Sequence, residues 1–265
     1  MGKDLTDTNS VNAFNMPVVD KSNQRYLQIV KEFNDRAVAC RQEKNFKCAI
    51  KNYNDALRID RESAVLYNNR GVVFFEQNEC DLAISDFSRA LKIEANLGVA
   101  HYNRGIAWRA KKKLNRAIAD FTRAIELASD FAVAYNNRGE AYSVNGEPDL
   151  AIKDFSNAIK IDSNFASAYN NLGECHFKQG NLSAAEFDYS QAIKIKPDFA
   201  VAFYNRGRLR LKKGDWDRAI ADLKKALKID PDFSRAYCLL SRLLKSDSRD
   251  VTVEPNKMLL TREED

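Results

Sequence analysis

The sequence predicts an all-α protein, an α-solenoid of six units that each contain two helices. Two observations predict this fold class. Glycines recur every 34 residues, and two alanines recur at the same interval with a large apolar residue between them. A period of this length with a fixed apolar pattern indicates stacked helix-turn-helix units that bury one continuous core. The glycines are Gly71, Gly105, Gly139, Gly173 and Gly207, with Ala37 at the same position of the first repeat.

The two helices of each unit are predicted from the small and large residues. The glycine is expected in the first helix, and the second helix carries the two alanines, whose small side chains let neighbouring helices approach closely. Pro148 is expected in the first turn of its repeat's second helix, where proline is tolerated. The large residues that fill each layer are Tyr53, Phe87, Phe121, Phe155, Tyr189 and Leu223. The repeats occupy residues 30–63, 64–97, 98–131, 132–165, 166–199 and 200–233.

A C-terminal capping helix is predicted over residues 234–245, which completes a solenoid spanning residues 23–245. Four leucines between residues 239 and 244 would shield the last repeat, whereas Arg235 and Arg242 would face water. Residues 1–22 and 246–265 show no helical period, and we expect flexible segments there.

The repeat resembles the tetratricopeptide repeat (TPR) family. The resemblance rests on segments such as AVAYNNRGEAY with AIKDFSNAIKI and FYNRGRLRL with AIADLKKALKIDPDF, and it covers about residues 30–233. It implies a right-handed α-solenoid of six helix-turn-helix units with a concave groove lined by the first helices. The sequence departs from the family where arginine replaces the usual leucine before the glycine, and where the closing proline is kept only at Pro197 and Pro231.

Composition places the chain among globular proteins of the cytoplasm. Of its 265 residues 45% are hydrophobic, yet no run is long enough to cross a membrane and the N-terminus has no apolar signal segment. The five cysteines are widely spaced, and we expect reduced thiols without a disulfide framework or zinc site. Gly2 and Thr6 fit the loose pattern for N-terminal myristoylation, although no polybasic second signal accompanies them.

No residue pattern indicates an enzyme, a metal or a cofactor. The glycines form no phosphate-binding loop, and the only histidines, His101 and His176, lie at different positions of different repeats. Both are expected to be packing residues. No nucleophile has a base within a recognisable motif.

A second periodic feature pairs an arginine with an aspartate sixteen residues later. We interpret the pattern as a repeated ion pair between helices, either within one repeat or between neighbours. The fifth repeat breaks it, with Leu172 in place of the arginine and Asp188 retained. The arginines are Arg70, Arg104, Arg138 and Arg206, and the aspartates are Asp86, Asp120, Asp154 and Asp222.

The net charge of +5 is unevenly distributed and does not indicate a nucleic-acid-binding protein. Basic residues outnumber acidic ones in the third and sixth repeats, whereas the second, fourth and fifth repeats are net acidic. A solenoid that binds nucleic acid would present one continuous basic stripe with aromatic platforms. Nucleic acid is therefore kept only as a third alternative.

A column of asparagines gives the main functional hypothesis. The resemblance places it on the first helices, facing the concave groove, and a carboxamide can bond to the backbone of an extended peptide whatever its sequence. Alternatively, the amides bond neighbouring helices and have a structural role. The asparagines are Asn69, Asn103, Asn137, Asn171 and Asn205. The groove side chains expected to select the peptide are Val65, Val99, Val133, Ser167 and Val201, and Val72, Ile106, Glu140, Glu174 and Arg208.

The predicted function is a non-enzymatic adaptor that binds a segment of a partner protein in the groove. The identity of the partner does not follow from the sequence. The alternative is a self-assembling scaffold, a homo-oligomer in which the cap of one molecule docks on the first repeat of another. The clamp by which some family members grip acidic chaperone tails needs basic residues that the matching positions, such as Val38 and Val99, do not supply.

Overall fold

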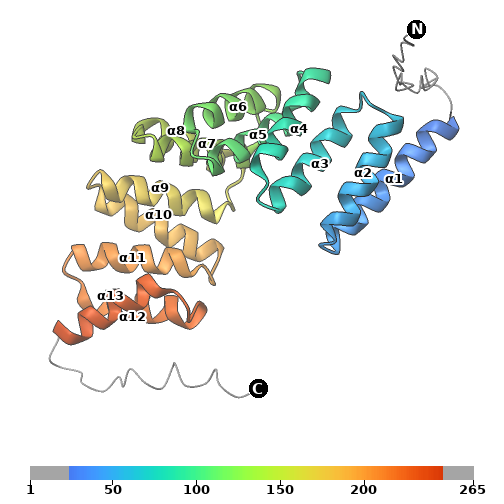
Figure 1. Cartoon of the computed structure of the whole chain (residues 1–265). Helices are drawn as coiled ribbons and strands as arrows, with labels where there is room; N and C mark the ends of the chain where they lie inside the picture. Colours follow the sequence, from blue (N-terminus) through green and yellow to red (C-terminus); the bar gives the residue numbers. More distant parts are fainter. Residues whose placement is uncertain (1–23, 247–265) are drawn as a thin grey trace, which may run out of the picture. The chain divides into compact units, whose positions relative to one another are not determined.

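The computed structural model describes residues 24–246, and all thirteen elements within them are α-helices (Figure 1). This confirms the predicted all-α repeat fold. The predicted N-terminal segment, the Gly2 acylation motif and residues 247–265 lie outside the described part of the chain. The chain divides into two compact units, residues 1–107 and 108–265, and the division falls inside α5 (Gly98–Ala110).

The first unit contains two helical hairpins and most of α5. The first four helices pack one against the next in sequence, and Ala100 of α5 joins one buried cluster with Ala64 and Ala90. Ala37, Ala49 and Ala56 are fully buried around the Tyr53 ring, as the periodic pattern predicts. The helices are α1 (Gln24–Gln42), α2 (Phe46–Ile59), α3 (Ala64–Glu76) and α4 (Cys80–Ile93).

The second unit continues the same packing to the capping helix. Consecutive helices again contact each other along the unit, and α13 packs on α12. Pro148 begins α8, as predicted. The helices are α6 (Leu114–Leu127), α7 (Ala132–Val144), α8 (Pro148–Ile161), α9 (Ala166–Lys178), α10 (Leu182–Ile195), α11 (Ala200–Lys212), α12 (Trp216–Ile229) and α13 (Ser234–Ser246).

The recurrent glycine marks the closest approach of the two helices in a repeat. A Cβ atom added at Gly71 would lie 2.7 Å from Cε1 of Phe87, and one added at Gly139 would lie 2.8 Å from Cε1 of Phe155. Both rings are almost completely buried and have little room to move. A side chain at Gly71 or Gly139 would therefore displace the ring, whereas the first repeat carries Ala37 at this position.

The turn after each first helix contains a residue with positive φ, a periodic feature that the sequence analysis missed. Gly146, Gly180 and Gly214 have φ values of 84°, 82° and 81°, which glycine adopts without steric cost. The corresponding residues Lys44, Asn78 and Lys112 adopt φ values of 57°, 62° and 57° with a side chain present. The later repeats therefore form this turn with less strain.

The first hairpin corrects the prediction that the cysteines are free thiols. Cys40 near the end of α1 and Cys48 in α2 form a disulfide, with their Cα atoms 5.7 Å apart. The short turn between the helices brings the two residues within bridging distance, although eight positions separate them in sequence. Cys80, Cys175 and Cys238 are free thiols.

Candidate functional site on the first helices

The predicted ion pairs lie within a repeat, from the first helix to the second. Arg138 donates through Nε and Nη2 to the two carboxylate oxygens of Asp154, at 2.7 and 2.8 Å. Arg206 holds Asp222 in the same way, at 2.9 and 2.8 Å. This answers the question of register that the sequence left open. Arg104 and Asp120 fall in different units, and their pairing stays a prediction.

Arg70 shows how such a pair affects ionisation. Its guanidinium donates to both oxygens of Asp86, each at 2.7 Å. These hydrogen bonds raise the pKa of Arg70, against the opposite effect of burial. The arginine is therefore permanently charged, and the buried carboxylate has a fixed counter-charge.

The same guanidinium groups also tie each repeat to the one before it. Nη1 of Arg138 donates to the hydroxyl of Thr122, sixteen residues earlier, at 3.0 Å. Arg206 bonds Ser190 at 3.1 Å, and Arg70 bonds Asn54. Each arginine therefore connects the second helices of two successive repeats through one rigid, planar group.

In the fifth repeat, which has no arginine at this position, a histidine contacts the aspartate instead. His176 lies one turn after Leu172 in α9, and its Nδ1 is 2.8 Å from Oδ2 of Asp188 in α10. Burial raises the pKa of Asp188, and the interaction with His176 opposes that effect only in part. The sequence analysis treated His176 as a packing residue, and its contact with a buried carboxylate was missed.

The predicted asparagine column bonds mainly to neighbouring first helices. Asn103 donates to Oδ1 of Asn68 at 2.9 Å, and Asn205 donates to Oδ1 of Asn170 at 3.0 Å. Asn137 instead donates to the carbonyl of Val133 at 2.9 Å, within its own helix. The amides therefore have structural partners, and their role in peptide binding stays a proposal.

The acceptors form a second asparagine column that the sequence analysis did not single out. Asn69 donates to Asn34 at 3.3 Å, and Asn171 donates to Asn136 at 3.1 Å. Donor and acceptor are 35 residues apart, one more than the repeat length. The Asn-Asn dipeptides in the sequence are the signal that could have revealed this ladder. The acceptors are Asn34, Asn68, Asn136 and Asn170.

Exposed valines accompany the amides on the first helices of both units. In the first unit Val65 and Val99 are 52% and 46% exposed, and in the second Val133 and Val201 are 42% and 39% exposed. Ser167 is also exposed, whereas Val72 and Ile106 are half-buried. In each unit, we call the surface formed by these residues and the asparagines of the column the first-helix face of that unit. An exposed valine therefore recurs at the same position of the second, third, fourth and sixth repeats.

The charged members of the predicted set are partly neutralised within the protein. Glu140 accepts hydrogen bonds from Arg109, Asn136 and Asn171. Glu174 lies 3.3 Å from Nη1 of Arg208 and also accepts from the Tyr189 hydroxyl at 3.0 Å.

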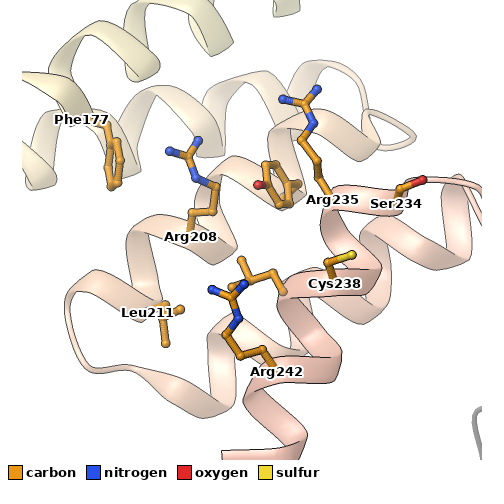
Figure 2. Close-up of a pocket in the computed structure, with 9 residues that line it drawn as sticks. Phe177, Arg208, Leu211, Ser234, Arg235, Cys238 and Arg242 are labelled. Atoms are coloured by element: carbon orange, nitrogen blue, oxygen red, sulfur yellow. The ribbon is translucent and has the colours of Figure 1, made fainter.

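A pocket of about 470 Å³ lies at the C-terminal end of the first-helix face of the second unit. Figure 2 shows Arg208, Arg235 and Arg242 around it, with Phe177 and Leu211 from α9 and α11. We call it the arginine pocket. Arg235 follows Val201 by one repeat length, and Arg242 follows Arg208 in the same way, so the capping helix extends the face. Its lining residues are Phe177, Tyr204, Arg208, Leu211, Ser234, Arg235, Cys238, Leu239 and Arg242.

The sequence analysis assigned the capping helix to shielding alone. Leu240 and Leu243 are indeed buried against the last repeat, as predicted. Arg235 and Arg242 are exposed, also as predicted, but they line a pocket as well.

Within residues 24–246 no cluster of His, Cys, Asp or Glu has the composition needed to hold a metal ion. In the same part of the chain, none of the helices combines the length and the apolar character needed to span a membrane.

The stacked helical hairpins and their repeated first-helix face define a helical-repeat protein of the α-solenoid class. Four copies of the tetratricopeptide repeat model match residues 98–131, 132–165, 166–199 and 200–233. A further TPR repeat model matches residues 38–78. The chain therefore belongs to the tetratricopeptide repeat family, as the sequence resemblance indicated.

Solved structures show the same fold. MamA is 27% identical with a TM-score of 0.58, over 66% of this chain and 95% of MamA. YrrB, a TPR protein with an unusual peptide-binding site, is 24% identical with a TM-score of 0.58, over 71% of this chain and 97% of YrrB. The Pseudomonas aeruginosa pilF protein is 18% identical with a TM-score of 0.73, over 83% of this chain and all of that protein. No curated protein sequence matches the chain.

Proposed function

We propose that this protein is a non-enzymatic cytoplasmic adaptor whose first-helix face binds a segment of a partner protein. Membership of a family of protein-binding repeats supports this function in general terms. The observation that carries the proposal for this chain is the row of exposed valines beside the asparagine column. In the second unit, Val133 and Val201 are exposed, whereas the adjacent Ala134 and Ala202 are fully buried in the core.

An extended segment can use both features of the face. Val65 and Val99 in the first unit lie one repeat apart, and Val133 and Val201 in the second lie two repeats apart with Ser167 between them. These valines offer apolar contacts along each unit. Asn69, Asn103 and Asn171 are half-buried, whereas Asn137 and Asn205 are buried. A carboxamide has two N–H donors and two oxygen lone pairs, so a half-buried amide can bond a ligand as well as a neighbouring helix. A peptide running along the unit would meet the same groups in successive repeats.

The structure shows which substitutions test the proposal cleanly. Replacement of the asparagines would remove bonds between first helices, so that a loss of binding could reflect a loss of stability. Val133 and Val201 are exposed, and their replacement by aspartate should leave the fold intact. The matched control replaces Leu150 and Phe187 by aspartate, because these side chains are 42% and 60% exposed on second helices.

The experiment compares partners captured by the wild-type protein and by the two double variants, with circular dichroism as a control for folding. Val133→Asp with Val201→Asp should lose the specific partner, since two charges would be buried in an apolar contact. Leu150→Asp with Phe187→Asp should retain it. The opposite outcome would place the binding surface on the second helices and overturn the proposal.

A further inference from the structure

We infer that the arginine pocket binds a partner peptide in which an acidic residue lies next to an aliphatic side chain. The inference rests on the proposed function, because the pocket ends the first-helix face of the second unit. It goes further by assigning a chemical class to the partner and a place on the face where that class is selected.

The charge of the pocket is unbalanced. Arg208 is paired with Glu174 at 3.3 Å, but Arg235 and Arg242 make no ion pair within the described part of the chain. None of the residues that line the pocket is acidic. Two guanidinium groups without a counter-charge at the rim of one concave site favour a carboxylate, which can accept two parallel N–H bonds from arginine.

The walls of the pocket are mostly apolar. Leu211 and Leu239 line it with aliphatic side chains, and Phe177 and Tyr204 provide aromatic surface. The Tyr204 ring packs against Phe233 with centroids 5.0 Å apart, which holds this wall in place. A site of this size with apolar walls and few charged groups suits a ligand that combines an aliphatic group with one or two carboxylates.

The aromatic rings also argue against nucleic acid as the occupant. The Phe177 ring is covered by Arg208 at 5.0 Å and Lys212 at 5.1 Å from its centroid. Tyr204 is flanked by Arg208 at 5.6 Å and Arg235 at 6.0 Å. Single-stranded nucleic acid binds by stacking its bases on open aromatic rings. Here cations already occupy those positions, so a peptide fits the pocket better than a base.

Cys238 provides an independent reporter of occupancy. It is an exposed free thiol in the lining of the pocket, as Figure 2 shows. Cys80 is a half-buried thiol on α4, in the other unit. Cys175 is buried, and burial raises the pKa of its thiol, which lowers its reactivity. A ligand in the pocket should therefore protect Cys238 from alkylation without affecting Cys80.

The probe is a short fluorescent peptide of leucine and glutamate, followed by fluorescence anisotropy with the full chain. Arg235→Gln with Arg242→Gln should weaken binding by about tenfold or more. The matched control, Arg218→Gln with Lys225→Gln on α12, removes the same charge from an exposed surface outside the pocket and should change affinity less than about twofold. Peptides with lysine for glutamate, or serine for leucine, should each bind about tenfold more weakly than the probe.

Three results would overturn the inference. The first is an equal loss of affinity in both double variants, which would mean attraction by net charge only. The second is protection of Cys238 by a single-stranded oligonucleotide, but not by the peptide, near physiological salt. The third is protection of Cys238 from alkylation without any added peptide, if this protection disappears when Glu263, Glu264 and Asp265 are replaced by amides. That result would mean that the chain's own acidic segment fills the pocket.

Separate measurements distinguish a failure of the proposed adaptor function from a failure of the pocket assignment. Val133→Asp lies outside the pocket and should abolish partner capture while the probe still binds and still protects Cys238. Partner capture that depends on Val133 but not on Arg235 and Arg242 would support the adaptor function and refute the pocket assignment.

Discussion

Arg138 grips the carboxylate of Asp154 with two parallel hydrogen bonds of 2.7 and 2.8 Å, across the two helices of one repeat. Asp154 is only 2% exposed, and its counter-charge comes from this single arginine. Asp154→Asn should lower the free energy of unfolding by about 3 kcal/mol, because Arg138 would stay half-buried without a carboxylate. Urea denaturation measures the change.

The control for this prediction is Asp198→Asn, at an exposed carboxylate in the loop before α11. It should alter the free energy of unfolding by less than about 0.5 kcal/mol. Equal effects of the two substitutions would show that the buried pair does not stabilise the repeat.

The closeness of the two helices in a repeat gives a prediction about Gly71. Gly71→Ala would place a methyl group 2.7 Å from the Phe87 ring and should cost about 1 to 3 kcal/mol in the free energy of unfolding. Gly207→Ala should cost less, since its nearest neighbours, the carbonyl oxygen of Ala219 and Cγ of Leu223, lie farther away, at 3.3 Å. A larger loss of stability at Gly207 than at Gly71 would contradict the packing described above.

The raised pKa of Asp188 predicts a pH dependence of the stability of the fold. A carboxyl whose pKa is higher in the folded state stabilises the fold while it is protonated in both states. That contribution is complete below the unfolded pKa of about 3.9 and is lost as the pH rises through the folded value. Compared with Asp188→Asn, the wild-type protein should therefore become relatively less stable from about pH 4 upward. Denaturation of both proteins across this range tests it, and a relative gain of wild-type stability would reverse the sign.

Leu172→Arg should restore the arginine pattern in the fifth repeat. Ser156 and Asp188 occupy the positions, sixteen residues before and after, that bond arginine in the fourth and sixth repeats. The variant should be more stable than Leu172→Gln by about 1.5 kcal/mol or more, because of the two introduced side chains only arginine adds a permanent positive charge beside Asp188. Equal melting temperatures for the two variants would show that the buried carboxylate does not need it.

The sequence was sufficient to predict the all-α repeat, because glycine, alanine and large residues recur at one interval. It also indicated the pairing of Arg138 with Asp154, but a fixed spacing of sixteen residues does not show whether the helices belong to one repeat or two. The disulfide between Cys40 and Cys48 was missed because it depends on the geometry of a helical hairpin. No interval of the repeat marks it.

The candidate site was predicted only in part. The asparagine column was visible, but its bonds to a second column, as in Asn205 to Asn170, need three-dimensional structure. The arginine pocket was missed because the capping helix was considered only as a shield. Its residues Arg235 and Arg242 follow Val201 and Arg208 at the repeat interval, so the same periodicity would have extended the site to them.

The most direct test of the adaptor function is photo-crosslinking in cells that produce the protein. A photoreactive amino acid replaces either Val133 or Val201 on the first-helix face, or Leu150 or Phe187 on second helices. We predict that a discrete partner is crosslinked from Val133 and from Val201, and that it is not crosslinked from Leu150 or Phe187. Crosslinking of the same partner from Leu150 and Phe187, with none from the valines, would contradict the proposed binding face.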